Sequence, residues 1–595
     1  MLQSKKQYRM GDCGWPACHR RSAAVSGGVV QLNKFALELR HARRWIPGRR
    51  GISMIGVAVA AAAVLLAASP GYADIVGTSA SVRSNNSLIV DLKVTTDDET
   101  TSGRGTKLFV TYQAAGVDPL VSRFIPVSST GLTTITIGRL RADTTYTYTV
   151  DAIGHPGGRA ETAYGSFTTG SLPAPLLLNT YRLTGRMTSP LVILPINQTN
   201  ANGTFRGYVA FDLNAPDAPR IVWYYSNAPS VASGVPQVDT VGGIVQEPHG
   251  NFLFADGGSG GPITADVFYR EIKPDGTIIR ESPRTCYVTP GPEDGIWGRG
   301  NGFHEQLLPG VYGVYDTVLH LGQIVKDPFF DAGLAPQGAR LQLGTTIRRW
   351  DPWTQTDLEV WNPFDFLDPL TERTTGMNSD PGANSNSRGL MRCATASLPI
   401  EQWTHANSLQ VAPTGEVLMS LRHLDTVIAI SPSFDRIAWR IGRFGSDFAF
   451  PEPSHKFYHE HFVRMLENGH LLLFDNGNGR PAGEGGQYSR ALELVLNRDA
   501  MTATKVWEYR HPVGDGYKYA DKVGIAQRLE NGNTLVLFGA DVDPSTLAVR
   551  NPQTFTLVEA DASPEAAAVA VLDMLIPGSA VVYRALPVRT LFGER

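Results

Sequence analysis

The sequence predicts an all-β protein in which a small β-sandwich precedes a six-bladed β-propeller. Three observations predict this fold class. Glycine and proline are abundant, at 61 and 39 of 595 residues, and both residues interrupt long helices. Runs of β-branched and aromatic residues alternate with polar ones at the period of two that is typical of half-buried strands. After about residue 180 a strand–turn–strand segment recurs, mostly at intervals of about 50–60 residues, as in propeller blades.

The charge balance excludes one class of function. Lysine and arginine total 53 against 56 aspartate and glutamate residues, for a net charge of −3, and the body of the chain has no long basic run. A protein that binds nucleic acid by neutralising phosphates is therefore not expected. A charged fraction of only 18% also argues against disorder, because disordered segments are usually rich in charge and poor in aromatic residues.

Residues 1–73 are interpreted as an export leader. An apolar stretch from Gly51 to Ala68 follows four arginines and precedes small residues at Gly71 and Ala73. This order is that of a cleaved signal peptide. An uncleaved single-pass anchor is the alternative, because the apolar stretch approaches spanning length. We therefore expect a periplasmic or secreted protein, with a membrane attachment only if the leader is retained.

Export decides how the cysteines are interpreted. Cys13 and Cys18 lie in the leader, which leaves Cys286 and Cys393 in an oxidising compartment. These two cysteines either form a disulfide or stay buried and inert. The sequence leaves both possibilities open.

Residues 74–173 are predicted to form the β-sandwich. Segments such as SLIVDLKVTT, KLFVTYQA and TTYTYTVDAIG alternate β-branched or aromatic residues with polar ones and are separated by polar turns. The segment LRADTTYTYTVDAIG resembles the corner of a fibronectin type III domain, with Tyr146 and Tyr148 placed for the corner tyrosine and the core. Because no cluster of chemically useful side chains appears, a spacer or substrate-shaping role is expected.

Residues 180–595 are predicted to form the propeller. Five segments, among them FVRMLENGHLLLFDNG and IAQRLENGNTLVLFG, read as strand, turn glycine and strand. The turn glycines follow one another at steps of 60, 105, 54 and 63 residues, and they are Gly250, Gly310, Gly415, Gly469 and Gly532. The step of 105 residues is about twice the others, so a degenerate unit is expected inside it, around LQLGTTIRRWD. Counting this unit gives six blades.

Polar residues fall at matching distances before the turn glycines. Asn407 and His461 lie eight residues before the turn glycines of their repeats, and His405 and His459 lie two residues earlier still. Because side chains alternate along a strand, we expect His405 and Asn407 to share one face, and His459 and His461 to form the matching pair.

Other repeats bring residues to the same end of the strands. Lys522 lies ten residues before its turn glycine, and His304 begins a strand before a PG turn. After the turns the chain returns to this end with Arg422 in one repeat and with Asp475 and Asn476 in another. If each strand is the innermost of its blade, these side chains converge at one mouth of the central channel.

The chemistry shared by these side chains is the handling of an anion. Arginine and lysine neutralise oxyanion charge, asparagine donates a hydrogen bond, and imidazole can act as nucleophile, base or acid. A metal site built on His459 and His461 is the main chemical alternative. Nearby cations argue against that alternative. His249 lies beside a turn glycine at the opposite end of its strand and is interpreted as a surface residue.

These motifs resemble the bacterial arylsulfate sulfotransferases. The resemblance rests on HANSLQVAPTGEVLMSLRHLDTVIAI, HFVRMLENGHLLLFDNGNGRP, AQRLENGNTLVLFG and VYRALPVRTLFGE, and it covers roughly residues 180 to 595. It implies an exported six-bladed propeller with an N-terminal β-sandwich. It also implies transfer of a sulfuryl group between phenols through a sulfated histidine, without the soluble nucleotide sulfate donor PAPS.

The resemblance also implies which residues are catalytic. By motif, the nucleophile is His461, and His405 and Arg422 hold the sulfuryl oxygens. His304 matches the family's first active-site histidine. Either His304 or His405 would protonate the departing phenolate and later deprotonate the acceptor phenol.

Further residues are implied to bind the substrate. They are Asn407, Lys522 and His459, of which His459 is also the alternative nucleophile. Lys522 is followed by Val523, where the family usually has a hydroxyl-bearing residue. One histidine that reacts twice requires ping-pong kinetics.

The expected partners are small phenols and aryl sulfates. No cofactor is expected, since the mechanism needs no nucleotide and the sequence lacks a P-loop motif. No nucleic acid is expected either, and the sequence leaves the oligomeric state open. Two other functions compete with sulfuryl transfer: an exported propeller that binds an anionic or glycan ligand without catalysis, and a sulfatase-like hydrolase.

Overall fold

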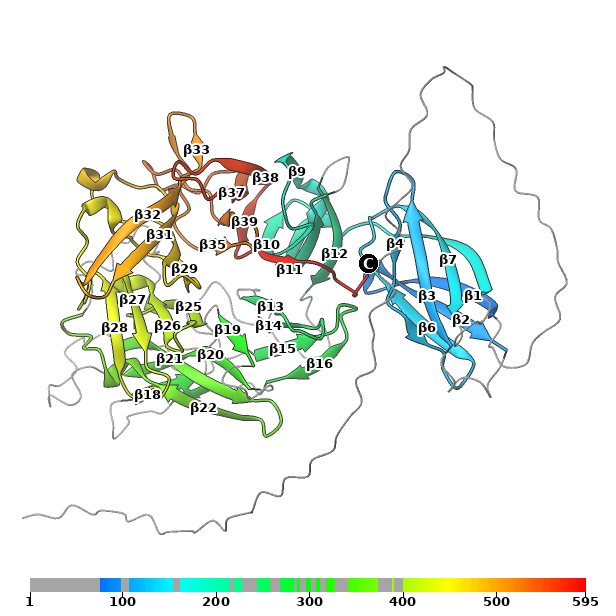
Figure 1. Ribbon diagram of the computed structural model, residues 1–595, viewed down its shortest axis with the longest axis horizontal. Helices are drawn as coiled ribbons and strands as arrows, with labels where there is room; N and C mark the ends of the chain where they lie inside the picture. Colours follow the sequence, from blue (N-terminus) through cyan, green and yellow to red (C-terminus); the bar gives the residue numbers. More distant parts are fainter. Residues whose placement is uncertain are drawn as a thin grey trace, which may run out of the picture. The chain divides into compact units, whose positions relative to one another are not determined.

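A computed structural model describes the greater part of the chain after residue 74 (Figure 1). The described residues are 75–97, 106–153, 161–214, 219–226, 243–256, 268–282, 286–288, 296–300, 306–310, 317–326, 341–372, 388–389 and 400–594. The expected export leader, His304 and Cys393 lie outside them, so the predictions made for these segments stay predictions. Within the described ranges, no helix is long and apolar enough to cross a membrane.

The prediction of an all-β protein is confirmed. The regular elements of the described residues are β-strands, with a few short 3₁₀-helices between them.

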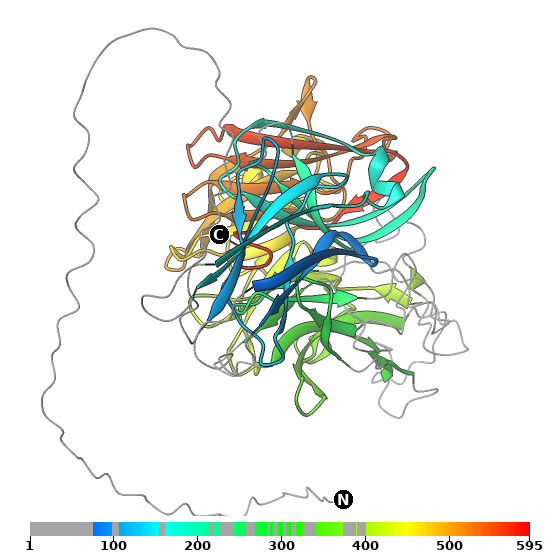
Figure 2. The ribbon, with the colours of Figure 1, turned by 90° about the vertical axis from the view of Figure 1, so that its right-hand side faces the viewer.

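The described part of residues 75–168 forms two sheets (Figures 1 and 2). One sheet has the strand order β1 (Ile75–Arg83), β2 (Asn86–Thr96) and β6 (Leu132–Ile137). The other has the order β4 (Leu120–Val121), β3 (Lys107–Ala114), β7 (Thr145–Ile153) and β8 (Glu161–Thr168), and β5 (Ile125–Pro126) also pairs with β3. Both sheets contribute to one hydrophobic core. Two sheets that share a core form a sandwich.

Tyr146 of β7 fills part of this core and is 2% exposed. Its hydroxyl accepts a hydrogen bond from the backbone N–H of Arg141 at 2.9 Å. A tyrosine that binds the backbone a few residues upstream is the contact of a tyrosine corner. The likeness to fibronectin type III domains itself stays a prediction.

In the described part of residues 180–594, six sheets follow one another along the chain. The first consists of β10 (Leu191–Asn200), β11 (Gly203–Asp212) and β12 (Arg220–Ser226), completed by β39 (Ser579–Val582) and β40 (Leu586–Val588). The second consists of β13 (Ile244–Gln246), β14 (Phe252–Asp256), β15 (Phe268–Ile272) and β16 (Ile278–Glu281). The third is larger and contains β17 (Cys286–Val288), β18 (Ile296–Gly300), β19 (Leu307–Pro309), β20 (Val318–Lys326), β21 (Leu341–Asp351), β22 (Thr356–Trp361), β23 (Arg388–Gly389) and β24 (Ile400–Gln402).

The last three sheets carry the candidate residues. The fourth consists of β25 (Ala406–Val411), β26 (Val417–Leu421), β27 (Thr426–Ile430) and β28 (Ile437–Gly442). The fifth consists of β29 (His461–Met465), β30 (Leu471–Asp475), β31 (Arg490–Asn497) and β32 (Thr502–Tyr509). The sixth consists of β35 (Ile525–Arg528), β36 (Thr534–Phe538), β37 (Gln553–Ala560) and β38 (Ala568–Ile576), completed by β9 (Thr180–Gly185). A short hairpin of β33 (Pro512–Val513) and β34 (Gly516–Tyr517) precedes it.

The expected position of the degenerate unit is wrong. The segment LQLGTTIRRWD forms β21, which pairs with β20. β20 also pairs with β19, the strand that ends just before Gly310, so β21 belongs to the same sheet as that hairpin. The described residues of the 105-residue step therefore belong to one enlarged sheet and not to two. The additional sheet is instead β10–β12, which no turn glycine of the predicted series marks.

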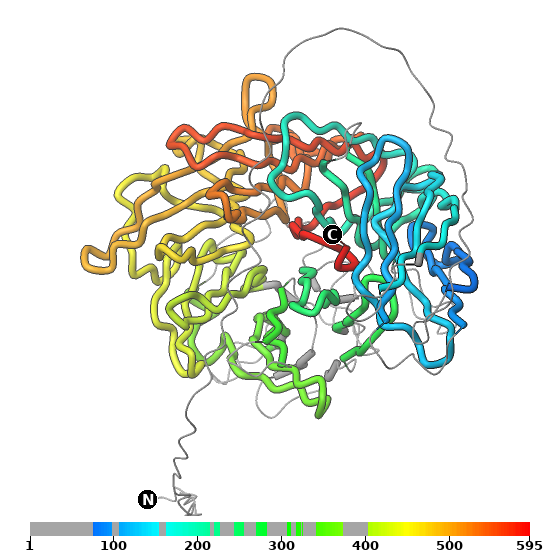
Figure 3. Tube along the Cα trace, turned by 45° about the vertical axis from the view of Figure 1, so that its right-hand side comes forward, coloured from blue at the N-terminus to red at the C-terminus, as the bar shows by residue number. Residues whose placement is uncertain are grey.

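The six sheets follow one another around a ring (Figure 3). Each sheet shares a hydrophobic core with the next, and the sixth shares one with the first. Members of each shared core from successive sheets are Ile193 and Phe254, Leu253 and Trp350, Ile347 and Ile428, Val427 and Leu473, Phe474 and Phe538, and Leu535 and Val192. Strand pairing also links the beginning and the end of residues 180–594. The early strand β9 pairs within the sixth sheet, and the late strand β39 pairs within the first. Successive packing of this kind is how propeller blades associate.

Candidate active site

The predicted site residues lie where the first strands of three consecutive sheets begin. His405 directly precedes β25, His461 is the first residue of β29, and Lys522 lies three residues before β35. Arg422 follows β26 and Asn476 follows β30, so the second strands return the chain to the same end. The structure connects all of these residues through the contacts described below. His304 lies outside the described residues.

His461 is held by an uncharged amide. Its Nδ1 atom lies 2.6 Å from Oδ1 of Asn476, and the histidine is 3% exposed. Asn476 donates through Nδ2 to the backbone oxygens of Ala520 and Val523, at 2.7 and 3.0 Å. Because both donor hydrogens of the amide are used, Oδ1 faces the ring and accepts the Nδ1 proton. The neutral ring of His461 then has its lone pair on Nε2.

His459 belongs to a second group of imidazoles. Its Nδ1 atom lies 3.0 Å from Oδ1 of Asp425, and its backbone N–H donates to the same oxygen at 2.8 Å. The rings of His459 and His423 have centroids 6.1 Å apart, and His423 stacks on His405 at 4.5 Å. The sequence analysis did not identify His423 or Asp425, although both belong to the motif SLRHLD that supplied Arg422.

The two histidines of the HEH motif thus have different partners. A carboxylate contacts His459, whereas an amide contacts His461. Engagement of the two Nδ1 atoms by separate groups does not favour a single metal ion between the rings. The two candidate nucleophiles therefore differ in the charge of their partners: a carboxylate lies against His459, whereas the neutral amide of Asn476 leaves the lone pair of a neutral His461 ring on Nε2.

Asn407 links the fourth sheet to the HEH motif. Its Nδ2 atom donates to the backbone oxygen of Glu460 at 2.6 Å, and its own backbone oxygen accepts from Nη2 of Arg584 at 2.6 Å. The Oδ1 atom of Asn407 is buried and accepts no hydrogen bond from any residue that the structure describes. One amide hydrogen of Asn407 is therefore used in a hydrogen bond to the protein backbone.

Glu460 is the acid between the two histidines, and it is fully buried. Its Oε1 atom accepts a hydrogen bond from the Ser420 hydroxyl at 2.8 Å. Burial, with a smaller contribution from the charge of Asp425, raises the pKa of Glu460 to about 8. At neutral pH this side chain is therefore mainly a neutral carboxylic acid.

Asp521 connects the two candidate cations. Its backbone oxygen accepts from Nη2 of Arg422 at 3.0 Å and from Nδ2 of Asn478 at 2.8 Å. Its carboxylate lies 3.1 Å from Nζ of Lys522. Arg422 is buried, with 4% exposure, whereas the Lys522 side chain is 40% exposed and paired with its own neighbour. Arg422 is consequently the better placed of the two to bind an oxyanion inside the site.

The backbone of the site departs from extended strand geometry. His405, His459 and Val523 adopt left-handed backbone angles, with φ of +43°, +55° and +54°. The β25–β26 ladder has an irregularity at Asn407, and the β29–β30 ladder has one after His461. Such bulges redirect side chains. Bulges and turns therefore interrupt the regular alternation at these residues, and the expected face-sharing stays a prediction.

A left-handed angle is unusual for a β-branched residue such as Val523 and costs on the order of 1–3 kcal/mol. The following residue, Gly524, has φ of +108°, and a Cβ atom there would lie 2.6 Å from the Phe474 ring. The chain thus enters the sixth sheet through a conformation that its neighbours enforce. Strain of this kind is concentrated at functional sites.

Asp475 does not join the cluster. It is fully buried, and its Oδ2 atom binds Nη2 of Arg480 at 2.5 Å and Nε of Arg490 at 2.8 Å. Its Oδ1 atom accepts from the backbone N–H of Tyr458 at 2.9 Å. This buried group of charges supports the loop that leads to the HEH motif.

Comparison with known proteins finds one family whose model matches part of the chain. Residues 351–572 match the model of the family described as Arylsulfotransferase (ASST), which confirms the predicted resemblance over this stretch. The stretch includes every candidate residue that the structure describes. No curated protein matches the chain.

Several solved structures are similar to parts of the chain. A protein of unknown function from Bacteroides caccae is 12% identical, covers 68% of this chain and 100% of its own, and has a TM-score of 0.30. A catalytically inactive virginiamycin B lyase from Staphylococcus aureus, solved with quinupristin, is 8% identical, covers 67% and 99%, and has a TM-score of 0.25. A protein from Lactobacillus plantarum is 7% identical, covers 67% and 99%, and has a TM-score of 0.29. Similarity at this level carries no argument about function.

Proposed function

We propose that this chain, which matches the arylsulfotransferase (ASST) family model over residues 351–572, transfers a sulfuryl group from an aryl sulfate to a phenol without PAPS. One observation carries the proposal. His461, oriented by Asn476 at 2.6 Å, lies in one contact network with buried Arg422 and with the row of three other imidazoles. A nucleophile with a fixed tautomer, joined through these contacts to a buried cation, is what sulfuryl transfer requires.

The first half-reaction sulfates the enzyme. Nε2 of His461 attacks the sulfur atom, a nitrogen–sulfur bond forms, and the bond between sulfur and the aryl oxygen breaks. The departing phenolate takes a proton from His405 or His304. Arg422 stabilises the sulfuryl oxygens, with smaller contributions from Lys522 and from the remaining amide hydrogen of Asn407. In sulfated His461, Nδ1 keeps its proton and continues to donate it to Oδ1 of Asn476.

The second half-reaction regenerates the histidine. The histidine that gave up its proton removes one from the acceptor phenol, and the phenolate oxygen attacks sulfur. The nitrogen–sulfur bond breaks, and its electron pair returns to Nε2 of His461. Donor and acceptor therefore use the same site in turn, which gives ping-pong kinetics through a sulfohistidine.

We also propose for this chain the architecture and the exported location that the family resemblance implies. The six sheets form a closed six-bladed propeller over residues 180–595, preceded by a fibronectin type III-like sandwich over residues 74–173. The cyclic sharing of cores among the sheets supports the ring. Residues 1–73 direct export to the periplasm or the medium.

Incubation of the purified protein with 4-nitrophenyl sulfate, with and without phenol, tests this function. Release of nitrophenol only when phenol is present is the expected result. Release at the same rate without phenol would identify a hydrolase. No release at any protein concentration would leave a binding protein for anionic or glycan ligands, and either result would overturn the proposal.

A further inference from the structure

The hairpins between the first two strands share one turn in four of the described sheets. In each turn, the residue three positions before the turn glycine donates its N–H to the residue after the glycine, at 2.8 Å, and accepts from the glycine N–H at 2.8–3.0 Å. The residues at this position are Glu247, Ala412, Leu466 and Leu529. The second sheet thus has a carboxylate where the others have an aliphatic side chain.

A second feature of these turns, a contact with a glutamate on the third strand, recurs in three sheets. The residue after the turn glycine contacts a glutamate on the third strand at 2.6 Å, and the pairs are Asn251 and Glu271, His470 and Glu493, and Asn533 and Glu559. Glu271 is therefore explained by the repeat alone. Glu247 and His249 are additions that the repeat does not explain.

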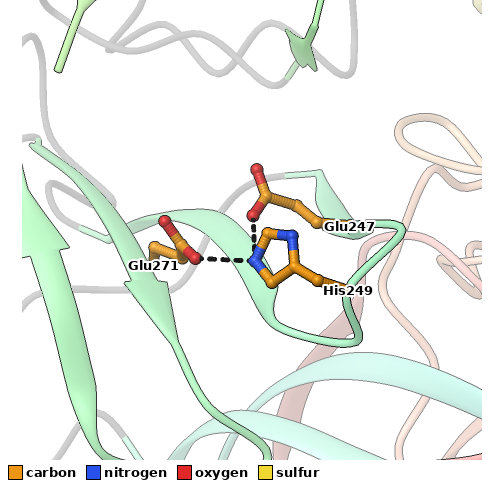
Figure 4. A group of neighbouring side chains, drawn as sticks. All are labelled: Glu247, His249 and Glu271. Carbon is orange, nitrogen blue, oxygen red and sulfur yellow. Dashed lines mark hydrogen bonds and ion pairs between the residues drawn. The ribbon is translucent and has the colours of Figure 1, made fainter. Parts of the chain in front are cut away.

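Glu247, His249 and Glu271 lie together at this turn (Figure 4). Oε2 of Glu247 lies 3.0 Å from Nε2 of His249, and Oε1 of Glu271 lies 3.1 Å from the same nitrogen. The Glu247 side chain is 7% exposed, and its Oε2 atom accepts no hydrogen bond within the described part of the chain. A buried carboxylate oxygen 3.0 Å from an imidazole nitrogen, with no hydrogen bond to satisfy it, is stabilised by a positive charge at this position.

The spacing of the three ligand atoms fits a small cation. In a tetrahedral site with metal–ligand distances of about 2.0–2.2 Å, ligand atoms are roughly 3.3 Å apart. The distances of 3.0 and 3.1 Å from Nε2 to the two oxygens are close to this value. We propose that Glu247, His249 and Glu271 bind one divalent transition-metal cation, for which Zn²⁺ is the best fit. The imidazole favours such a metal over Mg²⁺ and Ca²⁺, which prefer oxygen ligands only.

The groups around the three ligands have the arrangement of an outer shell. Nδ2 of Asn251 fixes Oε1 of Glu271, and Arg280 binds the other oxygen of that carboxylate. Arg280 also lies 3.9 Å from Oε1 of Glu247, whereas His249 contacts the other oxygen, Oε2. Its charge therefore faces the outer oxygens and leaves the inner ones for the metal. His249 is 56% exposed, so that a water molecule or a further ligand can reach the fourth position.

Titration calorimetry with Zn²⁺ on the chelator-treated full chain tests the site. The wild type is expected to bind one Zn²⁺ per chain, and Glu247→Leu is expected to lower the affinity at least about 100-fold. Leucine is tolerated by the same turn at Leu466 and Leu529, so this variant should fold. The matched control is Glu493→Gln. Glu493 is equivalent to Glu271, but its turn has Leu466 in place of Glu247, so this variant should leave Zn²⁺ binding unchanged.

Equal Zn²⁺ affinity in the wild type and in Glu247→Leu, or no Zn²⁺ binding by the wild type, would overturn the proposal and leave an imidazolium between two carboxylates. Crystals soaked in Zn²⁺ provide a measurement that needs no variant. An anomalous peak about 2.0–2.2 Å from all three ligand atoms is expected. A peak elsewhere would contradict the site. Both tests are independent of sulfuryl transfer, because this turn lies at the opposite end of the first strands from His461.

Discussion

Nδ1 of His461 lies 2.6 Å from Oδ1 of Asn476, and the two residues approach each other from the start of β29 and the end of β30. Asn476 is fixed in turn by the backbone of the loop that enters the sixth sheet. One amide therefore joins two sheets and selects the tautomer of the histidine. This relationship makes the assignment of the nucleophile testable.

Replacement of the two HEH histidines should have unequal effects. His461→Ala is expected to lower transfer from 4-nitrophenyl sulfate to phenol by about 10⁴-fold or more, because no nucleophile replaces Nε2. The acid-labile sulfated intermediate should disappear as well. His459→Ala should leave both measurable. The opposite result, with the intermediate retained in His461→Ala, would assign the nucleophile to His459.

Loss of Asn476 should slow the reaction without removing the nucleophile. In Asn476→Ala the ring of His461 loses the acceptor that selects its tautomer, so kcat is expected to fall by about 100-fold. The sulfated intermediate should still form, at a lower rate, in single-turnover measurements. Asn533→Ala, in a hairpin turn at the opposite end of the strands, serves as the control. Unchanged kcat in Asn476→Ala would show that the hydrogen bond does not orient the nucleophile.

The two cations should differ in their importance. Arg422→Met is expected to lower kcat/KM by about 100- to 1000-fold, since it removes a buried guanidinium from the developing oxyanion. Lys522→Met should cost about tenfold or less, because Nζ is partly exposed and already lies 3.1 Å from the Asp521 carboxylate. A larger loss in Lys522→Met than in Arg422→Met would reverse the assigned roles.

Local patterns predicted most of the strands that carry the site. The hairpins at Gly415, Gly469 and Gly532 are visible in the sequence, because a turn glycine with a left-handed angle separates two apolar runs. The sheet of β10–β12 was missed for a physical reason. It is completed by β39 and β40, which pair with β10 from more than 370 residues further along the chain, and no local pattern records such a pairing.

The site shows the same limit at the level of single residues. The distance of His461 from its turn glycine predicted which end of β29 it occupies. Its contact with Asn476 lies beside a bulge and the left-handed backbone angle of Phe462. The alternation of side chains along a regular strand, on which the prediction was based, holds only where neither feature is present. His423 was missed because its role comes from stacking on His405, which is a tertiary contact.

Glu460 couples the stability of the site to pH. The side chain is fully buried between the two histidines of the HEH motif, and its pKa is raised from 4.5 in the unfolded chain to about 8. Below the unfolded value, both states hold the proton and the stability is fully present. Between the two values unfolding releases the proton, so the free energy of unfolding falls as the pH rises, by about 1.4 kcal/mol per unit at most.

Glu460→Gln should remove this dependence, because an amide keeps an acceptor for the Ser420 hydroxyl but has no proton to lose. Urea unfolding of both proteins at pH 5 and pH 8 measures the effect. From pH 5 to pH 8, the unfolding free energy of the wild type relative to the variant is expected to fall by about 3 kcal/mol. Other titrating groups, such as His459 and Asp425, are present in both proteins and largely cancel in the difference. A difference that stays constant with pH would mean that Glu460 is ionised in the folded protein and that burial does not control its proton.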